Sequence, residues 1–272
     1  MSDTLRTAPD GTEVRTEFQK INACAKRPVD IWTNYLYYPF SLRLVYLIRN
    51  TRITPNMLTL GSLALALLGC LYYARGDRAA LTLGLVLSQM SYVIDCADGQ
   101  LARYRKQYSP IGGWLDQIAD RIKEFALYFS LAWGYTRVHP SAQHVWRWAM
   151  VALFALFLLE YLSQTEMFRV NGLPRRYNEN GVPIEDTPQA DAGDRFEQAR
   201  RLRALIPFKA FTIGEQYFAQ LVFIAFGWVY SFFVFVSILG LLMAVYRPLV
   251  EYVKHRRMVR RNQAAANSPQ SS

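Results

Sequence analysis

The sequence predicts an all-α, polytopic membrane protein with six transmembrane helices and an N-terminal amphipathic helix in the membrane interface. Of the 272 residues, 52% are hydrophobic and only 19% are charged, and the apolar residues gather in long uncharged runs with the charges between them. The 31 Lys and Arg residues outnumber the 21 Asp and Glu, and they lie mostly on one side of these runs. Disordered and fibrous classes are therefore excluded. Three cysteines at unrelated spacings predict neither a disulfide framework nor a zinc site.

The first predicted span is the uncharged run at residues 53–74, which is long enough to cross about 30 Å of hydrocarbon. Thr54 and Pro55 stand at its beginning, as is typical of a helix start. Three further spans are predicted at residues 79–94, 112–135 and 146–166.

The last apolar run, residues 216–246, fits either one overlong helix or two spans broken near Gly227 and Trp228. Two spans give a total of six and place both termini on one side of the membrane. That side then holds 27 of the 31 basic residues, and the other side holds only Arg75, Arg78, Arg137 and Arg147. The positive-inside rule therefore predicts six spans in the cytoplasmic membrane, with both termini in the cytosol.

The charge pattern also predicts the organisation around the spans. Residues 1–27 are expected to be a cytosolic tail, and residues 28–52 an amphipathic segment in the interface, interrupted at Pro39. Residues 53–250 form the predicted six-helix membrane domain, with a cytosolic loop at 169–209. The basic segment 251–272 is expected to be a largely disordered tail that anchors to anionic lipids and binds no nucleic acid.

Four aspartates within 26 residues lie in or at the ends of two predicted spans. A carboxylate near the centre of a membrane helix costs at least about 2.5–3.5 kcal/mol. Asp95 and Asp98 are three residues apart on one helix, and Asp116 and Asp120 are four apart on the next, so each pair shares a face. Because the connection is short, the helices are antiparallel neighbours, and we expect the four carboxylates to converge near the cytosolic helix ends.

Clustered carboxylates need cations to balance their mutual repulsion, and their hard oxygen atoms suit Mg²⁺ or Mn²⁺. The small residues Gly99, Ala102 and Gly112 leave a gap where a bulky ligand can lie against the backbone. Arg103 adds a planar, permanently charged donor fork suited to phosphate oxygens. This combination indicates phosphoryl transfer, in which two metals bridge a diphosphate and one aspartate acts as base.

The structural alternative is that the aspartates form buried ion pairs with Arg103, Arg121 or Lys123. We expect these basic residues to be too few and to lie off the carboxylate face. For Thr54 and Asn56, helix capping is the simpler explanation, and a contact from Asn56 to a nucleotide is the functional one.

These residues form the pattern Asp-x2-Asp-Gly-x2-Ala-Arg-x8-Gly-x3-Asp-x3-Asp, which is complete from Asp95 to Asp120. The pattern resembles the motif of the CDP-alcohol phosphotransferase family, and its eight fixed positions make it specific. The resemblance implies a six-helix, dimeric membrane enzyme with a cytosolic active site. Such an enzyme transfers a substituted phosphate from a CDP-linked donor to an alcohol and releases CMP. The likeness is close from Ile53 to about Thr136 and extends further only by topology.

The resemblance implies two Mg²⁺ or Mn²⁺ ions per site. Asp95, Asp98 and Asp116 would bind the first ion, and Asp95, Asp116 and Asp120 the second. Asp120 would also deprotonate the acceptor hydroxyl.

On the nucleotide side, the resemblance implies that Gly99, Ala102 and Arg103 face the cytidine diphosphate, with Asn56 as a further candidate. The implied partners are the CDP-linked donor, the alcohol acceptor, membrane lipids and a second copy of the chain.

Polar residues on the fourth and fifth spans are candidates for the acceptor pocket: Glu160, Gln164, Glu166, Glu215, Gln216 and Gln220. They either recognise the acceptor, or only line the cavity or pair with Arg121 and Lys123. Acidic residues at these positions argue against an acceptor phosphate and for a neutral polyol or a cationic group. The segment from Lys26 to Asn56, in contrast, resembles the family branch that makes inositol phosphodiesters, so the acceptor stays open.

The sequence therefore predicts a metal-dependent CDP-alcohol phosphotransferase in phospholipid or head-group biosynthesis. A synthase of a soluble, inositol-type phosphodiester is the alternative within the family. A membrane transporter is the alternative from another class, because intramembrane acids are typical of transporters too.

Overall fold

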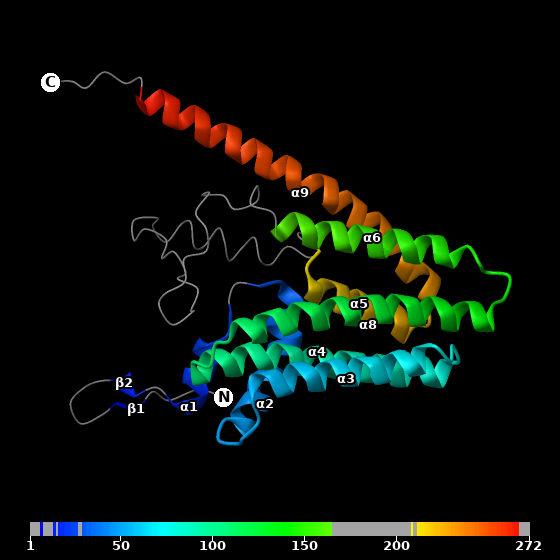
Figure 1. Ribbon diagram of the computed structural model, residues 1–272, viewed down its shortest axis with the longest axis horizontal. Coiled ribbons are helices and arrows are strands. Elements are labelled where there is room, and N and C mark those ends of the chain that lie inside the picture. Colours follow the sequence, from blue (N-terminus) through cyan, green and yellow to red (C-terminus); the bar gives the residue numbers. More distant parts are fainter. Residues whose placement is uncertain are drawn as a thin grey trace.

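The computed structural model describes residues 6–7, 13–14, 16–26, 29–164, 208 and 211–266. Helices make up almost all of this part of the chain, and the longest lie side by side (Figure 1). They are α3 (Pro55–Tyr73), α4 (Arg78–Arg105), α5 (Pro110–Val138), α6 (Val145–Gln164), α8 (Ile213–Ala225) and α9 (Val229–Ala266). Two short strands, β1 (Arg6–Thr7) and β2 (Glu13–Val14), pair near the N-terminus.

Four of the described helices are long and apolar enough to cross a membrane: α3, α4, α6 up to Leu162, and residues 229–250 of α9. The chain is therefore a multi-pass membrane protein. Helix α5 is as long as α4 but carries more charges, and α8 has only 13 residues. The hydrophobic core lies between these helices, with Leu131, Leu156 and Phe233 completely or almost completely buried.

The turn between α4 and α5 follows from its sequence. Lys106 ends α4 in the left-handed conformation, with φ 54°, and Gln107 donates from its backbone to the carbonyl of Ala102. Ser109 then caps α5 by accepting from the amide of Gly112, and Pro110 occupies the first helical position. This turn makes the two aspartate-bearing helices antiparallel, as predicted. They are not packed directly against each other, as the sequence analysis expected, because both pack mainly against α3.

Two other predicted helix boundaries are also confirmed. Thr54 caps α3 by accepting from the amide of Met57, with Pro55 at the first position. The last apolar run is broken between Ala225 and Val229, where Gly227 has φ +79°. The guanidinium of Arg78 donates to the carbonyls of Ile224 and Ala225 and so satisfies the end of α8.

The N-terminal segment packs as helices against α4. Helix α1 (Glu17–Ala23) begins in a capping box at Thr16. A π-helical turn, η1 (Thr33–Tyr37), leads into α2 (Tyr38–Ile48). The predicted interruption at Pro39 is thus a change of helix type. The pyrrolidine ring of Pro39 would clash with the preceding turn of an α-helix, and the wider π-helical turn leaves room for it.

Arg105, at the end of α4, holds the connection between α2 and α3. Its guanidinium donates to the carbonyls of Ile48 (2.9 Å), Arg49 (3.0 Å), Thr51 (2.9 Å) and Ile53 (2.5 Å). Two of these carbonyls belong to the end of α2, where backbone oxygens lack partners within the helix. The start of α3 is therefore attached directly to α4.

Glycines let α3, α4 and α5 approach closely at the opposite end of the bundle. A Cβ on Gly84 of α4 would lie 2.9 Å from the carbonyl oxygen of Gly69 in α3. A Cβ on Gly134 of α5 would lie 2.0 Å from the carbonyl oxygen of Tyr73. The backbones themselves are in contact at these two places, as is common between membrane helices.

The expectation of a largely disordered tail from residue 251 is wrong for most of that segment. Helix α9 continues without a break to Ala266, with Pro248 inside it. Residues 251–266 are rich in Lys, Arg, Met, Gln and Ala, which have high helix propensity, and an apolar preceding span supplies the nucleus for their helix. The predicted cytosolic loop 169–209 lies outside the described residues, apart from Phe208.

Candidate active site

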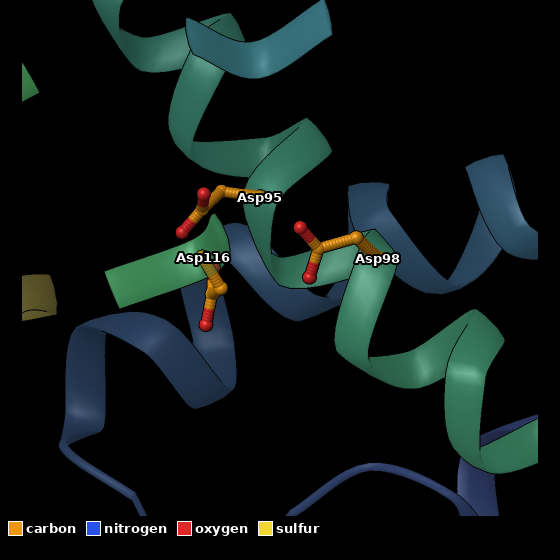
Figure 2. A group of neighbouring side chains, drawn as sticks. All are labelled: Asp95, Asp98 and Asp116. Atoms are coloured by element: carbon orange, nitrogen blue, oxygen red, sulfur yellow. The ribbon is translucent and has the colours of Figure 1, made fainter. Parts of the chain in front are cut away.

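Three of the four predicted carboxylates, two on α4 and one on α5, converge (Figure 2). Asp95, Asp98 and Asp116 each offer a carboxylate oxygen, and these oxygens all lie within 4.8 Å of one another. Asp98 is buried, and the other two are half-buried. Spacing alone therefore predicted the faces of both helices correctly.

Hydroxyl groups from α3 hold the carboxylates on α4. Thr59 Oγ1 donates to Asp98 Oδ2 at 2.6 Å, and Ser62 Oγ donates to Asp95 Oδ1 at 3.3 Å. Both hydroxyl residues are themselves buried, at 3% and 0% exposure. Hydrogen bonds to a charged acceptor are stronger than neutral ones, so α3 fixes the orientation of two of the three carboxylates.

The fourth carboxylate, Asp120, lies on the same side of α5 but is paired with Lys123. The Lys123 ammonium donates to Asp120 Oδ1 at 3.1 Å and also to Asp95 Oδ1. The expectation that Lys123 lies off the carboxylate face is wrong. Lys123 follows Asp120 by three residues and is therefore on the same face of the helix; its side chain is only 4% exposed.

The predicted nucleotide residues meet in two pairs beside this cluster. A Cβ on Gly99 would lie 3.2 Å from Arg103 Nη1, so the guanidinium of Arg103 covers Gly99. Arg103 Nε donates to the carbonyl of Cys24 at 2.5 Å, which connects α4 to the end of α1. A Cβ on Gly112 would lie 2.7 Å from Asn56 Oδ1. Ala102, one turn from Gly99, is half-buried.

A cavity of about 260 Å³ begins at Asp120 and extends between α5, α6, α8 and α9. Leu127, Leu156, Leu159, Phe211 and Phe232 form its apolar wall. Its acidic and basic lining residues are three acids and three bases: Asp120, Glu124, Glu160, Arg121, Lys123 and Arg247.

Among the predicted acceptor residues, Glu160, Gln216 and Gln220 line this cavity. Glu215 does not line it: its carboxylate accepts from the backbone amide of Thr212 at 2.8 Å and closes a capping box at the start of α8. The side chain of Gln164 and all of Glu166 lie outside the described residues.

Sequence reasoning missed four residues of this region. Thr59 and Ser62 are small polar residues three apart in an apolar span, and that pattern could have identified them. Tyr128 lines the cavity at 2% exposure, and its hydroxyl has no hydrogen-bond partner among the described residues. Arg247 also lines the cavity, and no ion pair is found for it in the described part of the chain. No local signal in the sequence links α9 to Asp120.

The residues present fit a hard divalent cation at Asp95, Asp98 and Asp116, because three carboxylates at this separation offer the oxygen ligands that Mg²⁺ or Mn²⁺ prefers. The cavity next to Asp120 offers a carboxylate base at one end and the guanidinium of Arg247 elsewhere in its lining. Such an arrangement can bind a phosphorylated ligand and accept a proton beside it.

A family model described as CDP-alcohol phosphatidyltransferase matches residues 52–177. The match contains the whole aspartate pattern, and the resemblance to this family that the pattern predicted is thereby confirmed.

Curated relatives agree with this family. A bifunctional IPC transferase and DIPP synthase of Aquifex aeolicus is 26% identical over 190 residues, which is 69% of this chain and 36% of the relative. The enzyme of the same description from Thermococcus kodakarensis is 32% identical over 43% of this chain and 25% of its own length. An archaetidylinositol phosphate synthase of Pyrococcus horikoshii is 34% identical over 30% of this chain and 42% of its own. The chain thus spans only about a quarter to two fifths of these relatives.

The fold is shared with a solved structure. The crystal structure of Mycobacterium tuberculosis phosphatidylinositol phosphate synthase with CDP-DAG bound has a TM-score of 0.52 and 17% identity, and the match covers 80% of this chain and 94% of that one.

Proposed function

We propose, from the CDP-alcohol phosphatidyltransferase domain at residues 52–177, that this chain transfers a substituted phosphate from a CDP-linked donor to an alcohol and releases CMP. One observation carries the proposal: three motif carboxylates meet within 4.8 Å, directly beside a cavity that begins at the fourth.

Asp95, Asp98 and Asp116 are the proposed ligands of a divalent cation, Mg²⁺ or Mn²⁺. Bound there, the cation supplies positive charge to the diphosphate of the donor. The second ion implied by the family resemblance fits less well, because Lys123 already occupies the space between Asp95 and Asp120.

The donor is proposed to lie over Gly99 and Ala102, with its phosphates toward Arg103. Gly99 leaves room for the nucleotide only if the Arg103 guanidinium, which covers it here, turns toward the phosphates. Asn56 lies against Gly112 at the other side of the cluster and is the proposed polar contact from α3.

Asp120 is the proposed general base. It lines the acceptor cavity while Lys123 holds one of its oxygens, so the second oxygen is left for the acceptor hydroxyl. The hydroxyl oxygen attacks the β-phosphorus, and its proton passes to Asp120. The bond from the β-phosphorus to the bridging oxygen breaks, and CMP leaves with that oxygen.

The proposed acceptor is a polyol that carries an anionic group. Two features support this choice over a neutral or cationic acceptor. Arg247 is a guanidinium in the cavity lining for which the described residues supply no ion pair. Arg121 lines the same cavity, with Glu124 as its partner at 2.7 Å. Glu215, one of the acids that argued against a phosphate, caps a helix outside the cavity. The Pyrococcus relative, in addition, is named for a product that contains inositol phosphate.

The proposed topology has six spans, formed by α3, α4, α5, α6, α8 and α9, in the cytoplasmic membrane. Both termini and the site would be cytosolic, as the basic residues predict. Residues 28–52 are proposed to lie in the interface; Tyr35, Phe40 and Leu47 in this segment are exposed and apolar enough to enter it. The functional unit is proposed to be a homodimer.

Purified protein in detergent tests the activity. CMP release should require a CDP-linked donor and an alcohol together, and it should stop in EDTA and return with Mg²⁺ or Mn²⁺. Donors and acceptors should be screened in pairs, with inositol 1-phosphate against inositol as the matched acceptors. Full activity in chelator would contradict the cation site, and a preference for unphosphorylated inositol would contradict the role of Arg247.

The transporter alternative is tested by the same protein in vesicles. Its carboxylates would have to line a path across the bilayer, whereas the three that meet here lie on neighbouring helix turns close to the α4–α5 connection. Uptake of a polyol phosphate without CMP release would favour transport.

A further inference from the structure

Lys123 is the most deeply buried charged side chain of the site, and its surroundings are made of carboxylates. The side chain is 4% exposed. Its ammonium bonds to Asp95 Oδ1 on α4 and to Asp120 Oδ1 on its own helix, the latter at 3.1 Å. Burying a lysine ammonium costs free energy unless carboxylates pair with it. The two carboxylates therefore make this position suitable for a cation.

The ammonium occupies the space that a second divalent ion would need. Such an ion would take oxygens from Asp95, Asp116 and Asp120. Two of these three residues are the partners of Lys123, and Asp120 does not belong to the group of oxygens within 4.8 Å of one another. A divalent ion bound to the same two carboxylates would lie against the ammonium, and the two positive charges would repel each other strongly.

We propose that the Lys123 ammonium replaces the second divalent ion in this chain, so that each site holds one divalent ion and one lysine. The inference rests on the proposed function, because it assigns the positive charges of that same site. Lys123 then balances part of the charge of the four aspartates permanently and keeps Asp120 turned toward the acceptor cavity, whose lining it shares. It is a positioning residue, since it acts on the reaction through Asp120 and Asp95.

Mn²⁺ binding to the full-length protein in detergent tests this proposal without any turnover. Isothermal titration counts the ions per chain, and electron paramagnetic resonance distinguishes an isolated ion from a pair. Two Mn²⁺ ions that share carboxylates lie about 3.5–4 Å apart, and their spectrum is broadened by coupling, whereas a single ion keeps six resolved lines. We expect one Mn²⁺ per chain in the wild type, with six lines.

The variant Lys123→Met removes the charge and keeps an unbranched side chain of similar length. We expect it to bind two coupled Mn²⁺ ions, with an affinity for the second ion at least about tenfold above the wild type. CMP release by this variant should then rise again over a second, higher range of Mn²⁺ concentration. Loss of a lysine with only a structural role would not produce this second range. Arg121→Gln is the matched control: it removes one positive charge two residues away, on a side chain paired with Glu124, and should leave the count at one.

The outcomes are separable. Two coupled ions in the wild type would overturn the inference and leave the proposed function intact. A Lys123→Met protein that still binds a single ion would overturn it as well, and if this variant does not fold, the wild-type count decides alone. Absence of any Mn²⁺ binding in the wild type would overturn the proposed function and this inference together.

Discussion

Replacing Gly112 by Ala tests the nucleotide side of the site through a single methyl group. The new Cβ would lie 2.7 Å from Asn56 Oδ1, and ordinary contact begins at about 3.4 Å, so the amide of Asn56 must move by about 0.7 Å. The obstructing atom is the end of a flexible side chain, and the fold should therefore survive. Ala is also preferred to Gly in a helix by up to about 1 kcal/mol.

We therefore expect Gly112→Ala to keep or raise thermal stability and to weaken the binding of the CDP-linked donor. Loss of one polar contact of about 1 kcal/mol corresponds to a rise of about fivefold in the donor KM. Donor-dependent CMP release and thermal unfolding in detergent measure the two effects. Gly113→Ala is the matched control, since a Cβ on Gly113 meets nothing within 4 Å, and its KM should stay unchanged.

A double-mutant cycle shows whether the effect passes through Asn56. Asn56→Ala should raise the donor KM by itself, and in the Asn56→Ala background Gly112→Ala should have almost no further effect. An unchanged donor KM in Gly112→Ala would refute the assignment of Asn56 to the nucleotide. Additive effects of the two substitutions would show that Gly112 acts by some route other than Asn56.

Three further predictions concern the base and the helix packing. Asp120→Asn should lower kcat by about 10²-fold or more with a smaller effect on donor KM, and a near wild-type kcat in the CMP assay would refute the base assignment. Arg105→Ala leaves four carbonyls without their shared donor and should lower the free energy of unfolding by about 3 kcal/mol, seen as a lower melting temperature; no shift would mean that water replaces the guanidinium. Gly134→Ala should prevent folding or cost several kcal/mol, because its Cβ would lie 2.0 Å from the Tyr73 carbonyl oxygen, while Gly61→Ala, which meets nothing within 4 Å, should leave the melting temperature unchanged.

Local signals made much of the fold predictable. The start of α3 at Thr54 and Pro55, and the break at Gly227, depend on the backbone preferences of a few residues and appear where they were expected. The faces that carry Asp95, Asp98 and Asp116 follow from helical periodicity and a short turn. Their convergence also depends on the packing of α4 and α5 against α3, which no local signal predicts.

Two predictions about the site, for Lys123 and Glu215, were wrong although the local sequence contains the signals that explain their positions. Lys123 is three residues after Asp120, and the periodicity that places the aspartates on one face places Lys123 there too. Thr212 and Glu215 have the spacing of a capping box, which accounts for Glu215 without an acceptor. Arg247 is a different case, because its place in the cavity depends on how α9 packs against α6 and α5, and that packing is not encoded in any short stretch.

The glycine contacts of α3, α4 and α5 have a mechanical consequence for ligand binding. Gly84 is 14 residues before Asp98, and Gly134 is 18 residues after Asp116, so the contacts lie about 20–27 Å along the helices from the carboxylates. Backbones in direct contact have almost no freedom to separate, whereas the carboxylate ends repel one another until a cation binds. The three helices should therefore pivot about their glycine end, and a small rotation there becomes a larger displacement of Asp98 and Asp116. Hydrogen exchange should accordingly slow on cation binding near the α4–α5 turn and remain unchanged around Gly69 and Gly134.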